Sequence, residues 1–385
     1  MVIMSIKLNN VLSFYDFEAN FSYASKLKTN PIKGEYLKHL PSFRYKKLNI
    51  FVGSNATGKT SLIKCIWKTL LFIAQKNKVH IIDLFNAKYD SSFIEIDLVE
   101  DNSQGYLLHR FKIKSNNTVE DIEVKVSHTC VPLSTAQSSY DSYEIKAKEL
   151  NEMEDNYMDY LECLNHTGRF ISWNTILPAT EEGFDKIDFA NPQNAEEEKA
   201  YENILERVFN TLDPSIVHVS KSKDASNAYV FKHESIGKII IQEGMVISAI
   251  PYLSSGTKYG INIANMMFGI KYHQNGIYLI DEQFSYVNSD IEAAILSTMV
   301  SMLGDDEQIF FTTHNSNILS LKLPFHSFYF MKKSLRNGRN EISISCGSEV
   351  ENRNNVSPKT ILDNDIFATA PNLNFIFELG EDEND

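Results

Sequence analysis

A glycine-rich segment carries the most specific chemistry in this chain of 385 residues: Gly53-Ser54-Asn55-Ala56-Thr57-Gly58-Lys59-Thr60. It matches the pattern GxxxxGK[ST], in which backbone N–H groups turn toward phosphate oxygens and the following helix adds its positive dipole end. Lys59 is expected to reach the β- and γ-phosphates of ATP, and Thr60 to place its hydroxyl on Mg²⁺. A buried-strand pattern before the motif and a helical pattern after it make a chance glycine turn the poorer explanation. The expected nucleotide-binding residues are Gly53, Ser54, Asn55, Ala56, Thr57, Gly58, Lys59, Thr60 and Ser61.

Two carboxylates follow a second apolar run, Ile277-Tyr278-Leu279-Ile280, far along the chain. A P-loop needs an acid at the end of another buried strand to hold magnesium. We expect Asp281 to hold Mg²⁺ and Glu282 to activate the attacking water. The alternative is a strand that simply runs into a polar turn, which the P-loop makes less favoured.

Two weaker features lie on either side of this acidic pair. Upstream, Leu253-Ser254-Ser255-Gly256-Thr257-Lys258 opens a helical pattern, and such a turn offers N–H groups and hydroxyls to an anion. Downstream, an apolar run over 308–312 leads to His314, whose side chain could reach a γ-phosphate. Taken alone, the turn is better explained as a helix cap and the histidine as a structural residue.

In this order, the four motifs resemble those of the ATP-binding-cassette (ABC) ATPases, in the soluble branch that holds the SMC-like and OLD-like proteins. The resemblance implies that 253–258 is the signature motif, that 277–282 is the Walker B strand and that His314 is the switch histidine. It also implies a homodimer, or a higher homo-oligomer, in which two heads enclose ATP. Ser255 and Gly256 would then touch the nucleotide of the partner subunit. Lys59, Glu282 and His314 are the catalytic residues that follow from the resemblance.

The sequence departs from that pattern in several places. The glutamine expected after the strands of the first lobe has two candidates, Gln104 and Gln137, and neither lies at a convincing strand end. The segment between the P-loop helix and the signature is too short for a long coiled-coil arm. We also expect no appended nuclease domain after His314.

The elements that must position these motifs predict an α/β fold: an ABC-type P-loop ATPase head with a mixed sheet flanked by helices and an inserted, partly helical lid. Apolar runs predict buried strands at 47–52, 276–280, 308–312 and 325–332. Apolar residues at helical spacing predict helices at 60–75 and 290–303. Alternating runs predict antiparallel strands at 93–99, 106–114 and 121–126.

An acidic middle segment separates the two halves of this head. Helical patterns at 143–164 and 195–212 flank an irregular stretch, and short strands follow at 229–232, 238–242 and 245–250. We therefore predict an N-terminal lobe over 1–142, an acidic helical insertion over 143–228 and a C-terminal lobe over 229–385.

Charge is distributed unevenly over these parts, although the formal net charge of −13 argues against a simple basic nucleic-acid binder. Residues 26–47 carry seven basic side chains and one acid, interleaved with Tyr36, Phe43 and Tyr45. This stretch is a possible nucleic-acid contact, with a solvated surface loop as the alternative. Residues 149–207 hold fifteen acids and four basic side chains. The acidic helices either dock a basic partner or pack on the head as a solvated pair.

Composition excludes several classes of protein. With 43% hydrophobic residues the chain can bury a core, and no apolar run reaches the roughly 18 residues of a membrane span. Four widely separated cysteines without a CxxC pair disfavour a disulfide framework or a zinc site. We expect a cytoplasmic protein without a signal peptide or membrane contact.

Stand-alone ATPases of this type with a small acidic insertion resemble the ATPase components of bacterial anti-phage defence systems such as Septu, PARIS and retrons. The resemblance implies an enzyme that hydrolyses ATP and senses for, or gates, a separate effector, either a nuclease or a toxin. The alternative is a DNA-repair or recombination ATPase that acts directly on DNA ends. A third possibility is a binding module whose ATP is structural.

Overall fold

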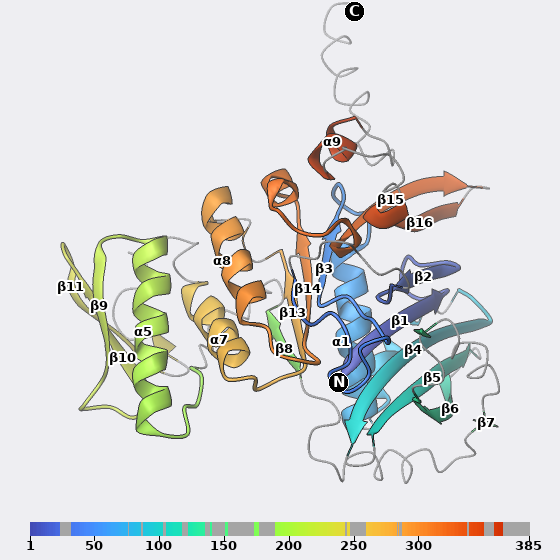
Figure 1. Cartoon of the computed structure of the whole chain (residues 1–385), viewed down its shortest axis with the longest axis horizontal. Helices are drawn as coiled ribbons and strands as arrows, with labels where there is room; N and C mark the ends of the chain where they lie inside the picture. Colours follow the sequence, from blue (N-terminus) through green and yellow to red (C-terminus); the bar gives the residue numbers. More distant parts are fainter. Residues whose placement is uncertain are drawn as a thin grey trace, which may run out of the picture.

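The structure is a computed structural model, and it describes most of the two predicted lobes and part of the predicted insertion. The described residues are 1–23, 32–75, 77–85, 88–102, 105–117, 122–134, 139–140, 151–152, 173–176, 189–242, 245–246, 259–282, 284, 287–336, 339–349 and 358–364. Within these ranges the chain forms three sheets, and the helices lie between and beside them (Figure 1).

The central sheet has the strand order β16-β15-β3-β14-β13-β8. Its strands are β3 (Leu48–Val52), β8 (Trp173–Ile176), β13 (Ile277–Asp281), β14 (Gln308–Thr313), β15 (Phe328–Arg336) and β16 (Arg339–Cys346). Neighbouring strands are parallel except for β15 and β16. The carboxyl ends of β3, β13 and β14 therefore meet at one edge of the sheet, where a P-loop fold binds its ligand.

Both faces of the central sheet are buried, which explains why its strands read as continuous apolar runs. Phe310 points to the face covered by helix α1 (Lys59–Gln75), and its neighbours Ile309 and Phe311 point to the opposite face. Helices α7 (Gly260–Lys271) and α8 (Ser289–Met302) cover that opposite face (Figure 1).

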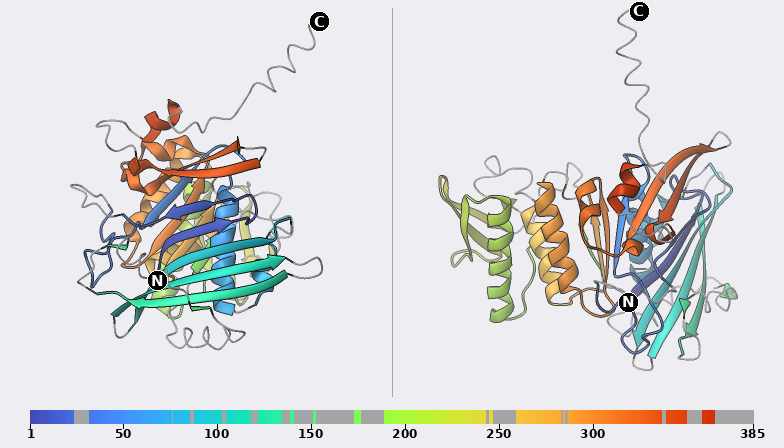
Figure 2. Two further views of the ribbon diagram at one scale, coloured as in Figure 1. Left: turned by 90° about the vertical axis from the view of Figure 1, so that its right-hand side faces the viewer. Right: turned by 45° about the horizontal axis from the view of Figure 1, so that its top comes forward.

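An antiparallel sheet of the N-terminal lobe covers the outer side of α1 (Figure 2, blue and cyan strands). Its strand order is β2-β1-β4-β5-β6-β7. The strands are β1 (Val2–Asn9), β2 (Phe17–Asn20), β4 (Ser91–Asn102), β5 (Gly105–Asn117), β6 (Ile122–Pro132) and β7 (Asn151–Glu152). Alternate residues such as Ile94 and Ile96 join Leu62 and Ile66 of α1 in one core, so the P-loop helix is held between two sheets. The short helix α2 (Val79–Ile82) contacts α1.

A second antiparallel sheet lies on the far side of the molecule, with the order β12-β11-β10-β9 (Figure 1, yellow-green). Its strands are β9 (Ile216–Lys221), β10 (Ala228–His233), β11 (Gly237–Gln242) and β12 (Met245–Val246). Helix α5 (Ala195–Leu212) lies between this sheet and α7. A Cβ atom on Gly260 would lie 2.9 Å from the Phe209 ring, so glycine permits this close helix contact.

The C-terminal part completes the head with short elements. They are the 3₁₀ turns η3 (Ser316–Ser320), η4 (Phe325–Ser327) and η5 (Gly347–Glu349) and the helix α9 (Pro358–Asp363). None of the helices in the described ranges combines the length and the hydropathy that a bilayer span requires.

The predicted fold class, an α/β fold with a mixed sheet flanked by helices, is confirmed in this architecture. The helix predicted at 195–212 is α5, and the antiparallel strands of both lobes are present. The sequence does not predict β2, β9 or β8. The strand β8 comes from the predicted insertion and pairs with β13 of the central sheet. The strand predicted at 325–332 begins later, because residues 325–327 form a 3₁₀ turn after Pro324. Within the helix predicted at 143–164, the two described residues, Asn151 and Glu152, form the strand β7 instead, because they pair with β6. The rest of that range and both glutamine candidates lie outside the described residues.

Candidate active site

The P-loop connects β3 to α1 with a backbone that only certain residues can adopt. Gly58 has φ +93° and Ala56 has φ +61°, both in the left-handed region. A Cβ atom on Gly53 would lie 2.5 Å from the Met331 carbonyl oxygen, and one on Gly58 would lie 2.6 Å from Ile342 Cδ1. Both glycines of the motif are therefore required by the backbone and its close neighbours.

Lys59 lies at the centre of the site, with its ammonium group buried under the loop. Its Nζ donates hydrogen bonds to the carbonyl oxygens of Gly53 at 2.9 Å and Ser54 at 3.0 Å. The same atom lies 3.6 Å from Glu282 Oε1 and 3.4 Å from His314 Nδ1. Burial lowers the pKa of Lys59, and the negative charge of Glu282 opposes that shift. The lysine thus joins the P-loop to the residues that follow β13 and β14.

Asp281 ends β13 and is fully buried. Its Oδ1 accepts hydrogen bonds from Thr312 Oγ1 at 2.5 Å and from Thr60 Oγ1 at 3.2 Å. Burial raises the pKa of Asp281, and the two hydroxyl donors oppose the shift. A threonine hydroxyl and a carboxylate are hard oxygen donors of the kind that Mg²⁺ prefers, and Thr60 is exposed to an incoming phosphate. Thr60 and Asp281 therefore fit a magnesium site.

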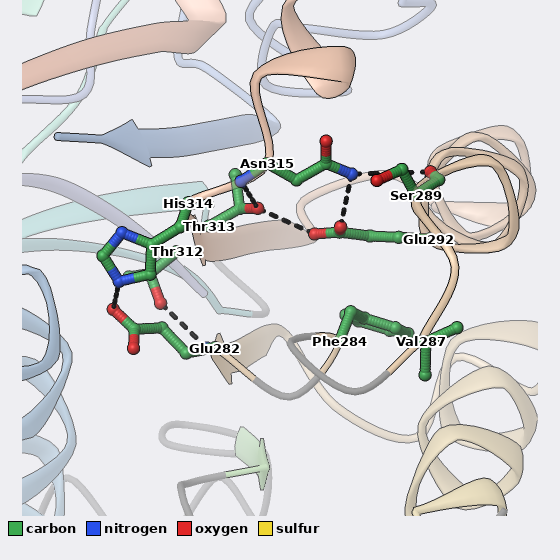
Figure 3. Close-up of a pocket in the computed structure, with 9 residues that line it drawn as sticks. All are labelled: Glu282, Phe284, Val287, Ser289, Glu292, Thr312, Thr313, His314 and Asn315. Carbon is green, nitrogen blue, oxygen red and sulfur yellow. Dashed lines mark hydrogen bonds and ion pairs between the residues drawn. The ribbon is translucent and has the colours of Figure 1, made fainter. Parts of the chain in front are cut away.

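Glu282 and His314 form a close pair at the mouth of the site (Figure 3). His314 Nε2 lies 2.8 Å from Glu282 Oε1, and about a third of each side chain is exposed, 35% and 27% respectively. Glu282 has φ +48°, a conformation that is uncommon for residues other than glycine, and its N–H donates to Thr312 Oγ1 at 3.0 Å. Strained backbone of this kind clusters at functional sites, and here it directs the carboxylate toward the histidine.

A cavity of about 330 Å³ opens beside this pair (Figure 3). It lies between the carboxyl ends of β13 and β14 and the first turn of α8. Its lining is formed by Glu282, Phe284, Val287, Ser289, Glu292, Thr312, Thr313, His314 and Asn315.

The structure brings most of the residues predicted for the site into one place. Lys59 and Thr60 come from the start of α1, Asp281 and Glu282 from the end of β13, and His314 follows β14. Their predicted roles stay predictions, because no ligand marks them. Ser255 and Gly256 lie outside the described residues, so the predicted signature motif stays a prediction as well.

Two residues of the site are not predicted from the sequence. Thr312 links the carboxylate of Asp281 to the backbone of Glu282, and Glu292 of α8 accepts hydrogen bonds from the turn that carries His314. The signal for the first is the pair of threonines that ends an otherwise apolar strand. The sequence carries no signal for the second, because an acid in the first turn of a helix is ordinary and its burial depends on tertiary packing.

The basic stretch at 26–47 differs from its prediction. Phe43 and Tyr45 are fully buried, and so are the side chains of Lys46 and Lys47. Lys46 Nζ donates to Tyr329 Oη at 2.8 Å, and Lys47 Nζ donates to the Gly304 carbonyl oxygen at 2.6 Å. Phe43 and Tyr45, which are interleaved with the charges of the predicted nucleic-acid contact, are not available at the surface, because residues 43–47 pack into the core. In the described part, exposed side chains of the predicted pattern include Lys33, Tyr36 and Lys38.

The acidic helix α5 also has partners within the chain. Glu198 pairs with Lys221, and Glu206 Oε2 lies 2.6 Å from His218 Nδ1. Glu202 Oε1 accepts from the Lys221 N–H at 2.7 Å, which fastens the helix to β9. Of the two alternatives for this helix, packing on the head is the one that these contacts favour.

Comparisons with known proteins bear on the fold. No family model matches the chain, and no curated protein matches its sequence. Among solved structures, an SMC head bound to the C-winged helix domain of ScpA is 14% identical with a TM-score of 0.53; the alignment covers 91% of this chain and 100% of that one. The SMC head domain from Thermotoga maritima is 14% identical with a TM-score of 0.44, over 89% and 98% of the two chains.

The recombination mediator protein RecF is also similar, at 11% identity and a TM-score of 0.39, over 89% of this chain and 98% of RecF. The fold assignment rests on the first comparison, whose score is the highest of the three. At this level of identity the likeness concerns the fold alone, which is that of an SMC head.

Proposed function

We propose that this protein binds ATP with Mg²⁺ and hydrolyses it to ADP and phosphate. The observation that carries the proposal is the convergence of Lys59, Asp281, Glu282 and His314 beside a backbone loop that only a P-loop sequence can form. The SMC-type head fold supports the same conclusion, because it places these groups at the carboxyl edge of the parallel strands.

The P-loop would hold the phosphates through its backbone N–H groups and the start of α1. Lys59 Nζ already lies next to two loop carbonyls and would add its positive charge to the β- and γ-phosphates. Thr60 and Asp281 would hold Mg²⁺, which supplies charge neutralisation at the phosphate oxygens when it is bound. Thr312 keeps Asp281 in place for this task through its 2.5 Å hydrogen bond.

Glu282 is placed to act as the general base. In the hydrolytic step its carboxylate would take a proton from water as the water oxygen bonds to the γ-phosphorus and the bond to the ADP oxygen breaks. His314 lies 2.8 Å from the same carboxylate and would orient it. Partial exposure of both side chains leaves room for the phosphate and the water.

Two substitutions test the ATPase proposal. Lys59→Ala should abolish ATP binding, measured with a fluorescent ATP analogue, whereas Lys64→Ala in the same helix should bind normally. Lys64 is a matched control because it is exposed and pairs with Asp83 instead of the P-loop. Glu282→Gln should bind ATP but release no phosphate. Full phosphate release by Glu282→Gln would contradict the assignment of the base.

The proposal extends to a homodimer, or a higher homo-oligomer, that closes on ATP, with Ser255 and Gly256 contacting the nucleotide of the partner subunit. With ATP, Glu282→Gln should elute from a sizing column with at least twice the monomer mass by light scattering. Lys59→Ala and Ser255→Arg should remain monomeric under the same conditions. A monomeric Glu282→Gln protein that still binds ATP would overturn the oligomer and leave the ATPase proposal standing.

We further propose that this protein acts in anti-phage defence. Its ATP cycle would serve as the sensor for a separate effector, a nuclease or a toxin, or would control the activity of that effector. The similar SMC head is bound to a domain of another protein, ScpA, which supports partner binding by a head of this fold. In a phage-plating assay with the native locus, the wild type should restrict phage and Lys59→Ala should not. Equal plating of both would reject the defence role.

The competing function, an ATPase that acts directly on DNA ends, loses support from burial of Phe43 and Tyr45. Fluorescence anisotropy with DNA ends over a range of salt concentrations distinguishes the two functions. Tight binding that weakens steeply with salt would favour the DNA-repair function.

A further inference from the structure

We propose that Glu292 is a positioning residue, which holds the turn after β14 so that His314 reaches Glu282. This inference rests on the proposed ATPase function and assigns a task within that site to a residue outside the P-loop and strand motifs. Glu292 lies in the first turn of α8, and its side chain points to the turn formed by residues 313–315 (Figure 3).

The contacts of Glu292 occupy both of its carboxylate oxygens. Oε1 accepts from Thr313 Oγ1 at 2.8 Å, and Oε2 accepts from Asn315 Nδ2 at 2.6 Å. Thr313 and Asn315 are the two residues on either side of His314. The carboxylate therefore accepts one hydrogen bond from the residue before the histidine and one from the residue after it.

The turn itself is closed by a further contact. Thr313 Oγ1 accepts from the Asn315 N–H at 2.9 Å, so the same hydroxyl serves Glu292 and the backbone beyond His314. With both neighbours held, the direction of His314 from the end of β14 is restricted. Its Nε2 then lies 2.8 Å from Glu282 Oε1, and its Nδ1 lies 3.4 Å from Lys59 Nζ.

Burying the Glu292 carboxylate costs free energy, which its hydrogen bonds must offset. Only 4% of Glu292 is exposed, and burial raises its pKa, opposed by the donors on Asn315 and Thr313. Glu292 lines the same cavity as Glu282 and His314. Because it is buried, it does not serve as a solvated surface charge. Its geometry suits a rigid support, because a carboxylate can accept two donors in a fixed plane.

Glu292→Ala and Glu292→Gln test the proposal. Glu292→Ala removes both acceptors, and we expect kcat for ATP to fall at least tenfold with little change in KM. In Glu292→Gln, the amide oxygen can accept from Asn315 while its NH₂ donates to Thr313, so this variant should recover most of the activity. Asn288→Ala is the matched control: it removes the N-cap of the same helix, which accepts from the Asp290 N–H, without touching the turn. Its kcat should match that of the wild type.

A second readout does not depend on turnover. Diethylpyrocarbonate modifies exposed histidines, and mass spectrometry of the peptide that contains His314 reports the rate. In Glu292→Ala the rate at His314 should rise severalfold, because the ring is no longer held against Glu282, whereas Asn288→Ala should react like the wild type. Unchanged kcat together with an unchanged modification rate in folded Glu292→Ala would overturn the positioning role.

The two proposals can fail separately. If the wild type releases no phosphate from ATP, the proposed function fails, and the modification rate still tests whether Glu292 holds His314. If the wild type is active and Glu292→Ala has the same kcat, Glu292 is not needed to position the histidine in the reaction. If Glu292→Ala does not fold, Thr313→Val serves instead, because it keeps the side-chain shape and removes the hydroxyl that donates to Glu292 and accepts from the Asn315 N–H. It should lower kcat and raise the modification rate at His314.

Discussion

Two histidine–glutamate pairs in this protein have nearly the same geometry and very different surroundings. His314 Nε2 lies 2.8 Å from Glu282 Oε1, and His326 Nε2 lies 2.7 Å from Glu35 Oε2. The side chains of the first pair are 35% and 27% exposed, whereas those of the second are 3% and 0% exposed. Distance between the partners therefore does not distinguish a reactive pair from a structural one.

The buried pair joins two distant parts of the chain. Besides His326, Glu35 accepts a hydrogen bond from the Lys47 N–H at 3.1 Å. The Tyr23 ring stacks on His326 with 4.6 Å between the ring centroids. Since 291 residues separate Glu35 from His326, the pair fastens the segment before β3 to the turn before β15.

The open pair has a different set of neighbours. It lies beside the Lys59 ammonium group and a cavity of about 330 Å³, where a substrate could reach both partners. Solvent access and a nearby cation turn the same two functional groups from a structural contact into a candidate for catalysis. The comparison predicts that substitutions in the open pair lower activity, and that those in the buried pair lower stability.

The largest effect is expected for Glu282→Gln. Removal of a general base should lower kcat by at least roughly 100-fold, while the free energy of unfolding changes by less than about 1 kcal/mol because the pair is partly exposed. Phosphate release and urea denaturation measure the two quantities. A large loss of stability would remove the distinction between the pairs.

His314→Ala should have the next largest effect. Without the histidine, Glu282 loses its orientation, and a misplaced base can lower kcat by up to roughly 100-fold. Binding of a fluorescent ATP analogue should be retained, because the P-loop backbone is unchanged. Loss of nucleotide binding in a folded variant would show that His314 supports the loop more than the base.

His326→Ala should act on stability. Removing His326 takes away a buried hydrogen-bond partner of the Glu35 carboxylate, at a cost of about 1.5–3 kcal/mol in the free energy of unfolding. The kcat of the folded fraction should equal that of the wild type. Glu35→Gln is the second variant, for use if His326→Ala does not fold, and the same pattern is expected. A selective loss of kcat at full stability would contradict the structural role.

Tyr23→Leu should have the smallest effect. It removes the ring stacked on His326 and the hydroxyl that donates to the Glu35 carbonyl oxygen at 3.2 Å, together worth about 1 kcal/mol of unfolding free energy, and it leaves the His326–Glu35 contact in place. Thermal denaturation at a fixed pH measures the difference. If Tyr23→Leu is as damaging as His326→Ala, the contacts of Tyr23 and not the His326–Glu35 hydrogen bond are the main support.

Comparison of individual elements shows which parts of the structure sequence patterns can predict. The P-loop, β13 and β14 are predicted because each has a local signature, a fixed motif or an apolar run that is buried on both faces. The strand β8 is not predicted, because it has only four residues and no signature of its own, and it is defined by its pairing with β13. The sequence shows Phe43 and Tyr45 among basic residues and does not show that tertiary packing buries both rings.

By itself, the sequence determined the backbone of the P-loop, since glycine permits the positive φ at 58. The sequence also identified Lys59, Asp281 and Glu282 as the candidates for the phosphate-binding lysine, the magnesium-binding acid and the general base. Tertiary structure alone decided that Asp281 accepts a hydrogen bond from Thr312 and that Glu292 accepts hydrogen bonds from both residues beside His314. It also decided that one histidine–glutamate pair is partly exposed and the other buried. The physical reason is that local patterns encode backbone preference and burial of a face, whereas these contacts depend on which strand ends the parallel pairing brings together.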